Sequence, residues 1–118
     1  MALAQYQELA VAFASALVDG DFARATEMLG PPLSETVSAA DLNDSFDRMY
    51  RSYAEDDRPK RVWFDAEFSG EQWPAKQNGD VGWAYVAVQG EECVEAVTVT
   101  VAEKAGRLFI REVEWGRP

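Results

Sequence analysis

The 118-residue chain contains no histidine and only one cysteine. Without histidine it cannot build a Ser-His-Asp triad, a Cys-His pair, a histidine metal site or a histidine general base. The only cysteine, Cys93, cannot form an internal disulfide, and no histidine or basic neighbour would activate its thiol. Any acid–base chemistry therefore falls to Asp, Glu, Tyr or Lys side chains.

Positive charge and long apolar runs are also scarce. Eleven Lys and Arg residues stand against 21 Asp and Glu residues, which gives a formal net charge of −10. A surface of that sign repels phosphates, so we expect no nucleic-acid partner. No apolar run approaches the roughly 18 residues of a membrane span, and the N-terminus is typical of a helix rather than a signal peptide. We expect a cytoplasmic protein without membrane contact, metal or cofactor.

With 47% hydrophobic residues, the chain can fill one core, and we expect a single domain over residues 1–118. The first half shows helical spacing of apolar residues. A first helix is expected up to Gly20, and a second, short helix after the N-cap Asp21. A third helix begins at the capping box from Ser38 to Asp41 and extends to Tyr53.

The chain after Arg61 alternates apolar and polar residues, as strands do. Strands are predicted at 61–69, 81–88, 92–103 and 107–115, with two-residue turns at Gln89-Gly90 and Ala105-Gly106. Further strands would come from the loop at 70–80 or from the stretch at 33–37. Helices followed by a strand meander indicate an α+β fold with an antiparallel sheet of about four to six strands.

The predicted turns divide the sheet into two faces. Val99 then pairs with Glu112 and Val97 with Glu114. The face expected beneath the helices holds Ala84, Val86, Val88, Cys93, Glu95, Val97, Val99, Val101, Leu108, Ile110, Glu112 and Glu114. The opposite, aromatic face includes Trp83, Tyr85, Arg111 and Trp115, with Trp83, Ala96 and Trp115 in one row. A bulge in the long middle strand would exchange the faces beyond it.

The order of three N-terminal helices and then a strand meander resembles the nuclear transport factor 2-like superfamily of cystatin-like α+β cones. The segments that carry the resemblance are AFASALVDGDFARATEML and GRLFIREVEW. It implies three helices packed on the concave face of a curved antiparallel sheet, with a pocket between them. It also implies that the last strand sends alternate side chains, here Glu112 and Glu114, towards that pocket. Many enzymes of the superfamily carry pocket histidines, which this chain lacks.

Glu112 and Glu114 allow two interpretations. They either end a strand in water or form a shielded carboxylate pair that works as a general acid or base. At least one, Glu112 above all, is expected to be substantially shielded. Tyr50 and Tyr53 are either core residues or hydroxyl donors to the same pocket. The predicted pocket lining is Tyr53, Val97, Val99, Ile110, Glu112 and Glu114, and the catalytic candidates are Glu112, Glu114 and Tyr50.

Three functions remain open from the sequence. The first is a non-enzymatic binding domain for a small apolar ligand or a peptide, which forms a homodimer through Trp83, Tyr85, Arg111 and Trp115. The second is an isomerase, dehydratase or cyclase that uses a pocket carboxylate with a tyrosine. The third is an acidic inhibitor or immunity-type partner of a basic protein. The absence of a specific catalytic motif favours the first.

Overall fold

The computed structural model describes residues 4–51, 56–64 and 78–116. Within them the chain forms four helices followed by a curved, four-stranded antiparallel sheet in the order β1-β2-β3-β4. The predicted α+β class is confirmed. The helices are α1 (Gln5–Val18), α2 (Phe22–Thr26), α3 (Leu33–Thr36) and α4 (Ala39–Arg51). The strands are β1 (Arg61–Phe64), β2 (Asp80–Gln89), β3 (Val94–Lys104) and β4 (Arg107–Trp115).

The helix boundaries follow local signals in the sequence. Gly20 takes the left-handed conformation after α1 (φ 77°), and Asp21 caps α2 by accepting the Arg24 N–H at 3.2 Å. The predicted capping box before α4 is present. Asp41 accepts the Ser38 N–H at 2.9 Å, and the Ser38 hydroxyl accepts the Asp41 N–H at 3.2 Å.

The stretch at 33–37, one of the two predicted sources of a further strand, is not a strand but contains the single turn of α3. Pro31 and Pro32 precede it and have no N–H groups to give to a ladder. Pro32 instead adopts the right-handed helical conformation, and the Ser34 N–H bonds the Gly30 carbonyl at 3.0 Å. A local turn therefore starts the helix directly after two residues that could not donate to a strand ladder.

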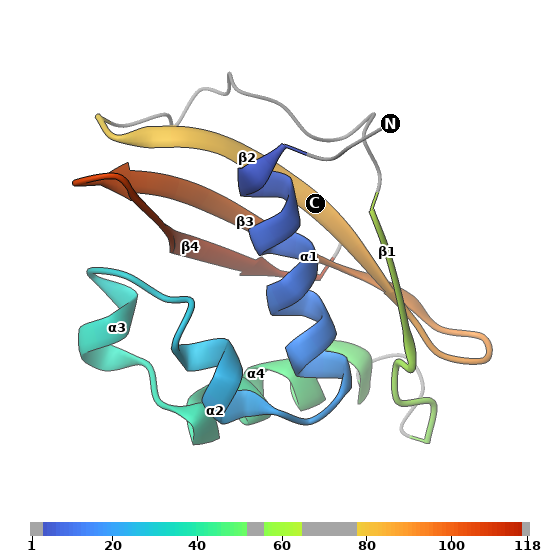
Figure 1. Ribbon diagram of the computed structural model, residues 1–118. Coiled ribbons are helices and arrows are strands. Elements are labelled where there is room, and N and C mark those ends of the chain that lie inside the picture. The colour runs from blue at the N-terminus through green and yellow to red at the C-terminus, as the bar shows by residue number, and fades with distance from the viewer. Residues whose placement is uncertain (1–3, 52–55, 65–77, 117–118) are drawn as a thin grey trace.

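All four helices lie on one side of the sheet (Figure 1). Helix α1 runs across the strands, and α2 and α4 pack near the C-terminal end of α1. The core lies between these two layers. Its largest fully buried aromatic and aliphatic side chains include Phe13, Leu17, Phe46, Val86, Val88, Val97, Val99, Val101 and Ile110. Each contributes about 1.5–3 kcal/mol of transfer free energy. The sheet face towards the helices is thus aliphatic, as predicted.

Two consecutive residues between α4 and β1 connect the layers. Arg58 donates to the carbonyls of Val18 at 2.6 Å and Leu17 at 3.2 Å, at the C-terminus of α1. Asp57 accepts the N–H groups of Glu91 (2.6 Å), Glu92 (2.8 Å) and Cys93 (2.5 Å) in the β2–β3 connection. These three backbone donors lower the pKa of the Asp57 carboxyl.

The Asp57 contact explains why the predicted turn at Gln89-Gly90 is wrong. The connection spans residues 90–93, and Gln89 pairs with Val94 instead. Gly90 packs directly against Asp57, because a Cβ atom there would lie 2.8 Å from the Asp57 carbonyl oxygen. The actual register differs from the predicted one by an even number of residues, so the two faces of β2 and β3 stay as predicted.

The β3–β4 connection is the predicted turn at Ala105 (φ 54°) and Gly106 (φ 79°), which has the two positive φ angles of a type I′ hairpin. From this turn the register begins as expected, with Val101 opposite Ile110. It then shifts by one residue between Thr100 and Val101, because β4 contains a bulge at Arg111. Beyond the bulge, the two faces of β4 are exchanged.

The exchange corrects the predicted positions of Glu112, Glu114 and Trp115. Glu112 pairs with Thr100 and Glu114 with Thr98, on the sheet face away from the helices, which we call the outer face. Val113 and Trp115 pair with Val99 and Val97, on the helix side. The bulge lets Arg111 bind Asp80, with Nε to Oδ1 at 2.8 Å and Nη2 to Oδ2 at 2.9 Å.

Candidate functional site

A hollow of about 340 Å³ separates β4 from α3 and α4, and we call it the α4 hollow. Its size falls within the range of small-molecule sites. Its apolar lining consists of Leu29, Leu33, Val37, Leu42, Val113 and Trp115, and its polar lining of Thr36, Asp41 and Ser45. Trp115 is half-buried and lies at one end. The hollow therefore offers an apolar surface with a few polar groups at its rim.

The polar rim carries a fixed negative charge. The N–H and hydroxyl of Ser38 lower the pKa of the Asp41 carboxyl, so this group is ionised at neutral pH. Its first role is to cap α4, which also fixes its position. Ser45 lies one turn further along α4 and presents its side chain to the same hollow.

Two further hollows adjoin this one. A hollow of about 290 Å³ shares Ser45 and Trp115 with it and continues along α4 to Arg48 and Met49. A hollow of about 450 Å³ lies on the other side of Leu29, between the start of α3 and the β3–β4 turn. We call it the Phe109 hollow, and its rim carries the exposed Lys104 and Arg107. The α4 hollow and its extension together follow the C-terminal half of β4.

Glu112 and Glu114 do not line the α4 hollow, because they lie on the outer face. Glu112 has a side chain that is 47% exposed, with Oε2 3.5 Å from Arg111 Nη1. The prediction that it is substantially shielded is wrong. Alternation carries no signal for this, because the face of Glu112 depends on the contact between Arg111 and the buried Asp80, 31 residues away.

Three residues that were predicted to line a pocket lie in the closed core and are at most 1% exposed, namely Val97, Val99 and Ile110. Val113 and Trp115 take the place that was predicted for the two glutamates. The hollow between the sheet and the helices is thus lined by other residues of β4 than the predicted ones.

Tyr50 is buried on α4, and its hydroxyl donates to Asp47 Oδ1 at 3.2 Å, within the same helix. Its ring packs edge-on against Phe46, with centroids 5.7 Å apart. The structure thus pairs Tyr50 with Asp47 and does not bring it to Glu112 or Glu114. Tyr53 lies outside the described residues.

On its helix side the sheet buries a carboxylate that was not a site candidate, Glu95, which is 2% exposed. It pairs with Val88 on the helix side of β3, at the position that the alternation of Val97, Val99 and Val101 indicates. A Cβ atom at Gly116 would lie 3.8 Å from its Oε2. Glu95 is therefore enclosed by the end of β4, and it does not line the α4 hollow.

Comparisons with family models, with curated proteins and with solved structures found no significant match to this chain. Within the described residues, no helix is long and apolar enough to cross a membrane. The same residues contain no group of three or more Asp, Glu or Cys side chains placed to hold a metal ion.

The outer face carries most of the residues predicted for a dimer interface. Trp83 and Tyr85 lie there, half-buried, in rows with Thr100 and Thr98. Trp115 does not, and the row predicted with Trp83, Ala96 and Trp115 is instead Trp63, Ala87 and Ala96. Arg111 reaches this face but is held by Asp80. The largest exposed apolar side chains among the described residues, Trp63 (50%) and Val94 (37%), both belong to the outer face.

Proposed function

We propose that this chain is a non-enzymatic binding domain that takes an apolar group into the α4 hollow. The observation that carries the proposal is the lining of that hollow, in which apolar side chains from three elements meet Trp115. An indole that is only half-buried offers a large flat contact surface to a ligand. The few polar side chains at the rim are typical of groups that orient a ligand within an apolar site.

The proposal includes membership of the nuclear transport factor 2-like superfamily. A helical layer against one face of a curved antiparallel sheet supports it, as does a hollow between the two layers. It also includes a homodimer that forms through the outer face. The exposure of Trp63 and Val94, beside the half-buried Trp83 and Tyr85, supports that part.

The binding proposal is tested by filling the hollow. Ser45→Trp places an indole between α4 and Trp115, whereas Ser34→Trp places the same group in the Phe109 hollow. We expect a neutral apolar dye such as Nile red to bind the unaltered chain. We expect the Ser45→Trp change to weaken that binding by about tenfold or more and Ser34→Trp to leave it nearly unchanged.

Methyl NMR spectra provide a second readout, since Val113 should shift on binding in the unaltered chain. Both variants are compared by circular dichroism to confirm that they fold. Equal binding by the unaltered chain and Ser45→Trp would contradict the proposal. A loss in Ser34→Trp alone would move the site to the Phe109 hollow and contradict it as well.

A further inference from the structure

The C-terminal half of β4 is an edge strand with backbone groups that point out of the sheet. Gly116 donates its N–H to the Ala96 carbonyl at 2.9 Å, so Gly116, Glu114 and Glu112 bond towards β3. By the alternation of an antiparallel ladder, Val113 and Trp115 direct their N–H and C=O groups outward. Within the described part of the chain, no backbone hydrogen bond from outside the sheet reaches them.

Nearer the start of β4, the same edge already pairs with a short extended segment, residues 28–30. The Ile110 N–H bonds the Met28 carbonyl at 2.9 Å, and the Gly30 N–H bonds the Ile110 carbonyl at 2.9 Å, as a parallel bridge. Pro31 and Pro32 end this segment because they lack the N–H groups that would extend it. The chain turns into α3, and no other segment among residues 4–51, 56–64 and 78–116 forms a backbone hydrogen bond with the edge at Val113 and Trp115, beside the α4 hollow.

We propose that an extended peptide with alternating apolar and basic side chains binds as a fifth strand at this open edge. The inference rests on the proposed function, since the apolar side chains would fill the α4 hollow and its extension towards Arg48. A strand added to β4 lies about 4.8 Å from it, with alternate side chains on opposite faces. One set then joins Val113 and Trp115 on the helix side, and the other set joins Glu112 and Glu114 on the outer face.

The charge on the outer face indicates which polar side chains the peptide carries. Arg111 binds the buried Asp80 and also lies 3.5 Å from Glu112, so its single positive charge is shared between two carboxylates. Among the described residues, the outer face beside the edge therefore keeps an excess of negative charge at the exposed Glu112 and Glu114. Lysine or arginine opposite them would form cross-strand pairs, whereas acidic side chains would be repelled. The net charge of −10 acts in the same direction at longer range.

The same charges disfavour a second copy of this chain at the edge. Two β4 strands paired across a twofold axis would bring the glutamates of one copy within about 5 Å of those of the other. Charged residues beside an open edge are a common protection against such self-pairing. The same glutamates attract a basic peptide and repel a second copy of this chain.

The test uses an eight-residue, capped peptide of alternating lysine and valine, labelled for fluorescence anisotropy. Two versions carry N-methyl groups, one on every lysine and one on every valine, because N–H groups of alternate residues point to opposite edges of a strand. We expect one version to lose binding by about tenfold or more and the other to bind within about threefold of the parent. Any other pattern overturns addition as a strand.

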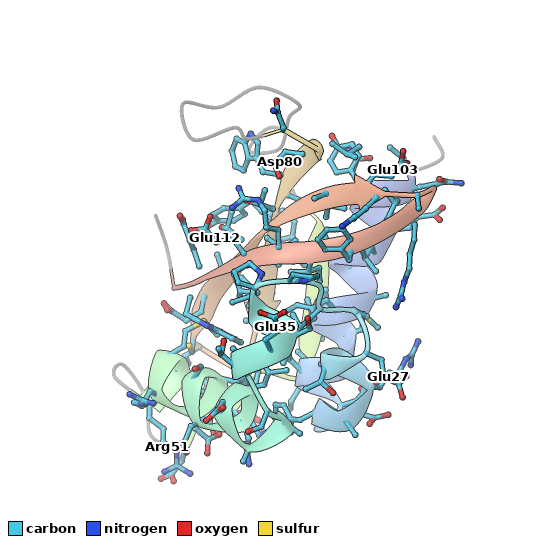
Figure 2. All side chains as sticks on the ribbon, turned by 90° about the vertical axis from the view of Figure 1, so that its left-hand side faces the viewer. Glu27, Glu35, Arg51, Asp80, Glu103 and Glu112 are labelled. Carbon is cyan, nitrogen blue, oxygen red and sulfur yellow. The ribbon has the colours of Figure 1, made fainter. Side chains whose placement is uncertain are left out.

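The charge argument is tested with two matched pairs of substitutions. Glu112→Lys with Glu114→Lys should weaken binding by about tenfold at low salt. Glu27→Lys with Glu103→Lys changes the net charge equally at the far end of the molecule (Figure 2) and should change binding by less than about threefold. Equal effects of the two pairs would overturn a local role for Glu112 and Glu114.

The outcomes separate this inference from the function on which it rests. If the apolar dye binds in a manner sensitive to Ser45→Trp but the peptide does not bind, the peptide inference is overturned and the apolar site stands. If neither binds, the proposed function is overturned. Slower exchange of the Val113 and Trp115 amides on peptide addition is expected, and unchanged exchange with peptide bound would overturn the placement.

Discussion

At the scale of single residues, the Asp57 carboxylate joins two parts of the chain that are distant in sequence. It lies in an irregular segment, yet it accepts three backbone N–H groups that are 34 to 36 residues away in sequence. Those donors would otherwise face solvent or remain unpaired at the tip of a hairpin. Their combined effect lowers the pKa of the carboxyl, with the Glu91 N–H as the largest contribution.

This lowered pKa has a consequence for stability against pH. A carboxyl with a folded-state pKa below its usual 3.8 stabilises the fold above that value, and the effect is lost as the pH falls through the folded pKa. We expect Asp57→Asn to be less stable than the unaltered chain by a constant amount from pH 7 down to about pH 5, and the difference to shrink below pH 3.8. Urea unfolding at several pH values measures it.

The control for this prediction is Asp56→Asn, at the exposed neighbour in the same segment. It should have little effect at either end of the pH range, because surface substitutions without specific contacts are close to neutral. A stability difference for Asp57→Asn that stays the same down to pH 2 would contradict the electrostatic explanation. In that case the loss of stability would come from the altered hydrogen-bond geometry alone and not from the charge of Asp57.

At the scale of elements, the bulge in β4 decides which side chains face the helices. It brings Val113 and Trp115 to the α4 hollow and moves two glutamates to the outer face. Without it, Glu112 and Glu114 would face Val99 and Val97 in the core, where an unpaired carboxylate is costly. The Asp80 side chain is fully buried and that of Arg111 is 15% exposed, so this pair holds the bulge in a largely dry environment.

We expect Arg111→Ala to destabilise the protein by about 3 kcal/mol, because it removes a bidentate partner from a buried carboxylate. Arg111→Lys keeps the charge but loses the fork geometry, and it should recover only part of that loss. Arg107→Ala, at an exposed position of the same strand, is the matched control. Chemical denaturation gives the three values, and similar losses for Arg111→Ala and Arg107→Ala would contradict this account.

The parts of the fold that the sequence predicts are those with local causes. The turn at Ala105-Gly106, the cap at Asp21 and the box from Ser38 to Asp41 depend on neighbouring residues, and all three are present. The helix-facing side of β2 and β3 follows from simple alternation. These features required no knowledge of distant contacts.

The errors have causes far away in the sequence. The β2–β3 connection depends on Asp57, and the face of Glu112 depends on the contact between Arg111 and Asp80, 31 residues apart. Alternation alone cannot reveal either contact. Alternation therefore placed Glu112 and Glu114 on the helix side of β4, where Val113 and Trp115 line the hollow instead.

At the scale of the whole molecule, the two sides of the sheet differ in what they expose. The helix side ends in a hollow beside an open edge, and the outer face carries Trp63 and Val94. An outer-face dimer would leave the edge of β4 available. The two proposed interactions can therefore be tested separately in the same protein.

We expect the protein to sediment as a dimer at tens of micromolar. Trp63→Asp should weaken dimer association by at least about tenfold and so shift the protein to monomer. The control is Ala23→Asp, which adds the same charge at an exposed position of α2. It should remain dimeric. Analytical ultracentrifugation that shows a monomer for the unaltered chain would contradict the dimer.

The adjacent contacts of Asp57 and Arg58 also bear on the order of folding. The β3–β4 hairpin can close on its own turn. The β2–β3 connection instead depends on Asp57, which reaches its position only when the helical half of the chain has folded. Arg58 ties that residue to the end of α1. Closing such a long loop is entropically costly before its contacts form. We therefore infer that β3–β4 forms early, and that β2 joins only as the helices dock, so that a fragment restricted to the strands would not fold alone.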